Sequence, residues 1–291
     1  TWYHMVFDHF EAIAGTMKVL ERDSLEKSLK LSASRFLDRW VFGSQWANVW
    51  GDRAVLNFQN FAMDLSDFNE KLKECSTNNF ITTVDRAIDQ LMGRVSSKAS
   101  EQINNTVVRD RRRVHAYYSL LWVWHRLDAK RWEHSSVPMR TGRKRITKLE
   151  VDHTVADALW HRLVEQEIVA KQATFTGTDE ERSLVAPDDF ESRHDALSFI
   201  NLLGNCCLLD KSFNVSKSDT PMWKFLQEVH EFKEHRIKRE EWEAALSLSQ
   251  TLTEPTGSTV AEIKGVVQAR DALIRKDLID FIAGNKHRMD V

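Results

Sequence analysis

The sequence has few of the residues that make tight turns or covalent cross-links. Its 291 residues include only 10 Gly and 4 Pro, too few for an all-β architecture with many turns, so helices are expected to dominate. The three cysteines, Cys75, Cys206 and Cys207, exclude a disulfide framework and include no Cys-x-x-Cys pair for a zinc ribbon. This cysteine usage favours a reducing, cytoplasmic setting.

Long apolar segments are also missing. No stretch approaches the roughly 18 apolar residues that a membrane span needs. The first residues, TWYHMVFDHFEAIAGTM, lack the basic start and apolar core of a signal peptide. We therefore expect no membrane partner. Because the chain begins at Thr1 rather than Met, we also expect it to be part of a longer protein.

Basic residues are present in a local excess, although the net charge is only −2. Residues 109–148 hold 12 Lys or Arg against 3 Asp or Glu, which is compatible with a solvated face or with a phosphate-binding surface. This run borders the candidate site described below, and that position favours the second interpretation. Its predicted DNA-binding residues are Arg143, Lys144, Arg145 and Lys148.

Two regions are expected from the chain's patterning. Residues 1–94 read as helical, with Asp23 and Glu26 in a capping-box arrangement, and the clustered Trp40, Trp46 and Trp50 are expected in a core. The polar stretch 94–106 is the predicted boundary. We therefore expect a helical domain or linker over 1–100 and a second domain over 105–291.

The second region is predicted to be mainly α with a small β-hairpin. An apolar stretch, 114–127, predicts a buried helix, and the alternation in ITKLEVDH predicts a strand over 146–153. Residues 171–190 read as a polar loop or insertion. A second strand in NLLGNCCLLD, a turn at KSF and a helix from NVSKSD onward follow. A long helix is expected to end at Gly284.

Four residues at the ends of these elements suit metal-dependent hydrolysis. Asp152 offers a hard oxygen ligand for Mg²⁺, and the adjacent His153 offers a base that titrates near neutral pH. Asn214 offers a second oxygen ligand. Asn205, nine residues earlier, is expected on the opposing strand, where its amide would hold the His153 loop by hydrogen bonds.

The order Asp-His, Asn, then Asn nine residues later resembles the HNH, or ββα-metal, nuclease motif. The spacing of Asn205, Asn214 and Lys217 is similar to that in the HNH domain of RNA-guided CRISPR nucleases. The segments DH, GNCCLL and NVSKS more closely resemble the C-terminal HNH domain of GmrSD-type restriction enzymes. The tail IKGVVQARDALIRKDLIDFI resembles that family's last helix, so the likeness covers roughly residues 105–285.

Two features depart from compact HNH motifs. His153 and Asn205 are 52 residues apart, so an insertion must loop out between the two strands. The last motif position is Asn214 rather than His, which removes a stronger ligand.

The resemblance implies a ββα-metal core embedded in helices and a metal-dependent DNA endonuclease that uses Mg²⁺ or Mn²⁺. It implies the effector part of a prokaryotic anti-phage restriction protein, whose partners are foreign DNA and an NTP-using sensor domain of the same longer protein. Lys217 either lends positive charge to the phosphate or faces solvent. His161, eight residues after His153, is read as a surface histidine or a phosphate neighbour. The alternative functions are a non-catalytic DNA-binding module and a helical interaction module with a degenerate motif.

Overall fold

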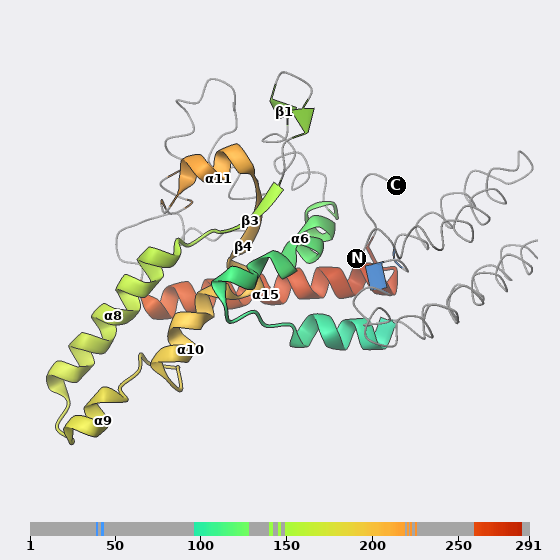
Figure 1. The fold of residues 1–291 in the computed structure, drawn as a ribbon. Helices are drawn as coiled ribbons and strands as arrows, with labels where there is room; N and C mark the ends of the chain where they lie inside the picture. The colour runs from blue at the N-terminus through green and yellow to red at the C-terminus, as the bar shows by residue number, and fades with distance from the viewer. Residues whose placement is uncertain are drawn as a thin grey trace, which may run out of the picture. The chain divides into compact units, whose positions relative to one another are not determined.

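The described part of the chain is mostly helical, as predicted from its low Gly and Pro content. The computed structural model describes residues 39, 42–43, 96–127, 140–141, 145–146, 149–218, 220, 222, 225 and 259–286 (Figure 1). Within these residues no helix combines the length and the apolar character needed to cross a bilayer.

Contacts divide the chain into two units, Thr1–Thr106 with Ile279–Val291, and Val107–Leu278. In the first unit, Arg39 Nε and Nη2 donate to the carbonyl of Ile282 at 3.0 and 2.9 Å, and Phe42 packs on Phe281 with ring centroids 5.7 Å apart. Residues 96–105, within the predicted boundary stretch, are helical. The candidate site lies wholly in the second unit.

The small sheet of the second unit is an antiparallel pair of β3 (Leu149–His153) and β4 (Cys206–Asp210) (Figure 1). In its register, Leu149 lies opposite Asp210 and His153 opposite Cys206. Of the strand expected over 146–153, residues 149–153 are confirmed as β3. Residues 145–146 instead form the separate short strand β2 (Arg145–Ile146), which pairs with β1 (Arg140–Thr141).

The segment between the paired strands is a helical insertion. It contains α8 (Asp157–Thr174), α9 (Asp179–Ser183), α10 (Arg193–Ser198) and two short 3₁₀ helices, η3 (Phe199–Asn201) and η4 (Leu203–Asn205). Residues 171–190, predicted as a polar loop or insertion, belong to this insertion, and they include the end of α8 and all of α9. A full capping box of Thr178 and Glu181 starts α9, because each side chain satisfies a backbone N–H of the other.

Helix α8 holds the insertion to the C-terminal helix through one apolar stripe. Trp160, Val164 and Ile168, spaced four residues apart, form a buried cluster with residues of α15 (Val260–Ala283). Phe199 adds a ring 5.4 Å from that of Trp160. This core closes the insertion back onto the domain, so that β3 and β4 meet despite their separation in sequence.

The short helix η4, just before β4, lies very close to α15 at Gly204. A Cβ atom on Gly204 would lie 2.0 Å from the carbonyl oxygen of Val267, so only glycine allows the approach. Arg270 of α15 then donates through Nη1 to the carbonyls of Gly204 and Cys206, at 2.5 and 2.9 Å. These contacts fix the position where β4 begins.

The apolar stretch predicted as one buried helix divides in two. Residues Arg111–Tyr117 form the 3₁₀ helix η1 and Tyr118–His125 form α6. Asp110 caps η1 by accepting a hydrogen bond from the backbone N–H of Arg112 at 2.9 Å. The predicted burial is confirmed for most of α6, and Trp124 donates its indole N–H to Asp277 of α15 at 3.1 Å.

The helix after β4 begins earlier than predicted. Helix α11 runs from Lys211 to Lys217, so residues 211–213 are helical rather than a turn and Lys217 ends the helix. Ser218, with φ 47°, takes the left-handed conformation just beyond it. Helix α15 ends as predicted, with Gly284 at φ 88°. The capping box at Asp23 and the tryptophan cluster at 40–50 lie outside the described residues.

Candidate functional site

The candidate site forms where β3, η4 and α11 come together. Successive side chains of a strand point to opposite faces, so Glu150 and Asp152 share one face of β3 and His153 lies on the other. The contacts of Glu150 and Asp152, described below, show that their face is covered by α11. The opposite face of β3, on which His153 lies, forms the second half of the site.

Asn205 holds the turn that follows His153. Its Oδ1 accepts from the hydroxyl of Thr154 and the N–H of Val155, both at 2.8 Å. Its Nδ2 donates to the carbonyls of Val155 at 3.1 Å and Ile200 at 2.9 Å. The side chain is fully buried, and these four bonds use all of its hydrogen-bonding capacity. Asn205 itself is the last residue of η4, immediately before β4, and not on the strand as predicted.

Lys217 reaches Asp152 across the α11 face of β3. Its Nζ lies 2.8 Å from Asp152 Oδ2, and the lysine side chain is only 1% exposed. The solvent-facing alternative for Lys217 is therefore wrong. Its hydrogen bonds go to the carbonyls of Ser218 and Thr220, at 3.4 and 3.2 Å. The Lys217 ammonium thus lies close to the Asp152 carboxylate but forms no directed hydrogen bond with it. Among the described residues, Asp152 Oδ2 accepts no hydrogen bond.

Asn214 lies on the same face but binds a different carboxylate. Its Nδ2 donates to Glu150 Oε2 at 3.0 Å, a bond that does not use the amide oxygen predicted to bind metal. Over the described residues, no three Asp, Glu, His or Cys side chains gather into a metal cage. Asp152 and Asn214 lie on the same face of β3, and a carboxylate and an amide oxygen are donor types that Mg²⁺ accepts when water and substrate complete its coordination.

His153 is buried on the other face, 6% exposed, and its Nε2 has no hydrogen-bond partner among the residues that the structure describes. Burial lowers the pKa of the imidazole, because charging it away from water is costly. The carboxylates of Asp152 and Asp157 oppose this shift, and the cations of Arg111 and Lys217 add to it. A neutral ring with a free nitrogen is able to accept a proton.

Helix η1 packs against β3, and its first residue meets the start of α8. Arg111 Nη1 lies 3.0 Å from Asp157 Oδ2, and His161 Nε2 lies 3.5 Å from the other oxygen of the same carboxylate. These three residues were missed as a group by sequence reasoning, because 46 residues separate Arg111 from Asp157. Glu150 was also missed, although its i, i+2 spacing from Asp152 was a visible signal.

The two thiols of β4 do not offer an alternative nucleophile. Cys206 and Cys207 are both fully buried and unpaired. Burial raises the pKa of Cys207 to about 12 and that of Cys206 well above its ordinary value, so both stay protonated at neutral pH. Their role is to pack the strand.

The structure thus places five predicted residues on or next to β3: Asp152, Asn214 and Lys217 on its α11 face, His153 on the opposite face, and Asn205 bonded to the turn that follows. Their catalytic and metal-binding roles stay predictions. The predicted DNA-binding residues cannot be placed around these five, because Arg143, Lys144 and Lys148 lie outside the described residues and only the backbone of Arg145 is described.

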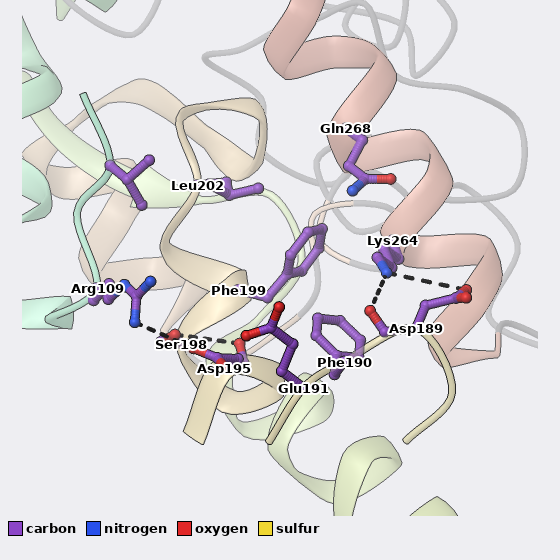
Figure 2. Close-up of a pocket in the computed structure, with 11 residues that line it drawn as sticks. Arg109, Asp189, Phe190, Glu191, Asp195, Ser198, Phe199, Leu202, Lys264 and Gln268 are labelled. Atoms are coloured by element: carbon purple, nitrogen blue, oxygen red, sulfur yellow. Dashed lines mark hydrogen bonds and ion pairs between the residues drawn. The ribbon is translucent and has the colours of Figure 1, made fainter. Parts of the chain in front are cut away.

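A separate pocket of about 360 Å³ opens between α10, η3 and α15 (Figure 2). Its apolar walls include Phe190 and Phe199, and the ammonium of Lys264 lies 4.4 Å from the centroid of the Phe190 ring. Lys264 donates to the carbonyl of Asp189 at 2.7 Å, and Arg109 bonds Asp195 at 3.2 Å. These cations are already paired, and none of the five predicted residues lines the pocket.

Comparison of the chain with protein-family models, curated proteins and solved structures finds no match in any of the three.

Proposed function

We propose that this protein is a metal-dependent endonuclease that hydrolyses phosphodiester bonds in DNA. The observation that carries the proposal is the hydrogen-bonded turn after His153. Asn205, from the segment that enters β4, makes three of its four side-chain hydrogen bonds to that turn, while α11 presents Asn214 and Lys217 to the opposite face of β3. The chain order of β3, β4 and α11 supports this reading, since the HNH resemblance implies two strands followed by a helix.

His153 acts as the general base in this proposal. Its unpartnered Nε2 takes a proton from the attacking water, and the lowered pKa keeps the ring neutral and able to do so at neutral pH. Asn205 is a positioning residue, because it fixes the backbone on which the imidazole is held. Such a fixed base avoids the entropic cost of ordering it during the reaction.

Asp152 and Asn214 are the residues that would hold Mg²⁺ or Mn²⁺. When bound, the metal supplies Lewis-acid stabilisation of charge on the phosphate. The Lys217 ammonium compensates the charge of the Asp152 carboxylate and lends positive charge to the region where the phosphate would bind. The hard-oxygen donor chemistry agrees with either cation.

The cellular role follows from the resemblance alone. We assign the protein to the effector part of a prokaryotic anti-phage restriction system, acting on foreign DNA under the control of an NTP-using sensor domain of the same longer protein. A reducing, cytoplasmic setting suits this role.

A non-catalytic module with a degenerate motif is the second candidate. The Lys217 ammonium favours it, because that cation already compensates the carboxylate predicted to bind metal. Under this alternative the protein binds DNA, or only another protein, and cleaves nothing.

A supercoiled-plasmid assay tests the two candidates. We expect nicked circles with Mg²⁺ or Mn²⁺ and none with EDTA. His153→Ala is expected to lower the rate by about 10² to 10⁴, the usual contribution of a general base. His194→Ala is the matched control, because that exposed histidine of α10 is outside the site. Equal rates for wild type and His153→Ala would contradict the assignment, and metal-independent binding without cutting would favour the second candidate.

A further inference from the structure

Arg111, Asp157 and His161 form a cluster of ionisable side chains that has no role in the proposed reaction. One carboxylate, Asp157, lies 3.0 Å from Arg111 Nη1 and 3.5 Å from His161 Nε2. Its own side chain is 16% exposed, whereas those of Arg111 and His161 are 60% and 48% exposed. The anion is therefore set back between two side chains that reach solvent.

The cluster lies beside the predicted base. Asp157 follows His153 by four residues, and η1, which carries Arg111, packs against β3. The charges of both Asp157 and Arg111 act on the His153 imidazole. A group bound by Arg111 at this place would lie next to the reaction that His153 is proposed to catalyse.

Arg111 keeps most of its donors available in this geometry. A guanidinium has five N–H donors in a planar fork, and the bond to Asp157 uses one nitrogen of that fork. Planar, bidentate donation is well matched to phosphate oxygens. The neighbouring arginines pair with carboxylates elsewhere: Arg109 with Asp195 at the separate pocket, and Arg113 with Asp110 at 4.0 Å.

We propose that Arg111 and His161 bind a backbone phosphate of the nucleic-acid strand adjacent to the scissile bond, with Asp157 orienting both side chains. This inference deepens the proposed nuclease function and rests on it. It names a phosphodiester as the ligand and places one contact of the substrate strand on η1 and α8. Asp157 is a positioning residue, since it touches the two binding groups and not the phosphate.

The test is DNA binding by the full chain in EDTA, where no cleavage is needed for a signal. Fluorescence anisotropy of a labelled duplex is measured over a range of salt concentrations. Arg111→Ala is expected to weaken affinity by about tenfold, the effect of one lost charge-assisted hydrogen bond. It should also lower the slope of log K against log salt by about 0.9, as one phosphate contact is lost.

Arg112→Ala is the matched control. It removes the same charge from the next residue of η1, and the Arg112 side chain has no ion pair with any residue that the structure describes. We expect its affinity to stay within about twofold of wild type, as for an ordinary surface charge. Equal losses in Arg111→Ala and Arg112→Ala would overturn the inference, because they would show general charge attraction.

Arg111→Lys and His161→Ala complete the test. The lysine variant keeps the charge but loses the fork, so we expect it to retain the salt slope of the wild type and to cleave plasmid more slowly. We expect His161→Ala to bind more weakly than wild type. A wild type that binds but never cleaves would overturn the proposed function and leave the binding result intact. Wild-type cleavage with unchanged binding and cleavage in Arg111→Ala would overturn only the inference.

Discussion

Asn205 and Lys217 are both buried polar side chains beside the His153 turn, yet their surroundings differ. Asn205 is neutral and makes four hydrogen bonds, all that its amide allows. Lys217 is charged, and the Asp152 oxygen that it approaches accepts no hydrogen bond. A saturated network fixes one conformation, whereas an ion pair without directed bonds leaves its carboxylate able to bind another cation.

The comparison separates two kinds of residue within one proposed site. Asn205 supports the backbone and has no capacity left for a ligand. Asp152 retains lone pairs, and Lys217 supplies the charge that makes its partial burial tolerable. We therefore expect changes at Asn205 to act mainly through stability, and changes at the Asp152–Lys217 pair to depend on what else neutralises the carboxylate.

The largest effect is expected for Asn205→Ala. The change leaves the Val155 N–H, the Thr154 hydroxyl and two carbonyls without their buried partner. At about 1–3 kcal/mol for each unsatisfied group, with some relief by water, we expect a loss of about 4 kcal/mol in the free energy of unfolding. Urea unfolding followed by circular dichroism measures it.

Asn201→Ala is the control for that loss. Asn201 is also buried, but its side chain donates one hydrogen bond, to the carbonyl of Arg109 at 3.0 Å. We expect its loss to be about 1 kcal/mol. Similar losses of unfolding free energy in the two variants would show that the four hydrogen bonds of Asn205 stabilise the fold no more than the single bond of Asn201.

Lys217→Met is expected to have the next largest effect. It leaves the Asp152 carboxylate without its cation, and breaking a buried pair costs about 3–5 kcal/mol. Because the Asp152 side chain is still 16% exposed, we expect the lower part of that range, about 3 kcal/mol. The double variant with Asp152→Asn should recover most of the loss, because no uncompensated charge remains. Additive losses in the double-mutant cycle would contradict the pairing.

The smallest effect is expected from pH at His153. Its pKa is lowered in the folded state, so the unfolded chain binds more protons once the pH falls below the ordinary histidine value of 6.5. The folded protein should therefore lose stability as the pH falls through 6.5, by at most about 1.4 kcal/mol per pH unit. His153→Gln should lack this contribution. The difference in unfolding free energy between the two proteins, measured from pH 7.5 to 5.5, tests the prediction.

Sequence reasoning found the elements whose signals are local. The apolar stripe of residues 260–283 and the following glycine predicted α15 and its end, because both depend on residues a few positions apart. The boundary of α11 was predicted too late, since the KSF segment reads equally well as a turn or a first helical turn. Within the strand predicted over 146–153, Ile146 pairs with β1 and residues 149–153 pair with β4, because alternation alone does not show which partner a segment has.

The candidate site was predictable in its residue types but not in its contacts. The spacing of Asn205 and Asn214 pointed to the motif, and the hydrogen bonds of Asn205 to the turn agree with the expected geometry. The pairing of Asn214 with Glu150, and of Lys217 with Asp152, was not predicted. Both depend on the angle at which α11 crosses β3, which no spacing in the sequence specifies.

The sequence by itself determined the mainly helical character of the described residues, a short strand ending in Asp152 and His153, and the order of the residues that follow, because these are properties of neighbouring side chains. Only the tertiary structure decided that a helical insertion folds onto α15, that Gly204 passes close enough to set the start of β4, and that Arg111 meets Asp157. Those outcomes depend on packing between segments distant in the chain. Such packing is specified by the shape and burial of many side chains together and not by any single motif.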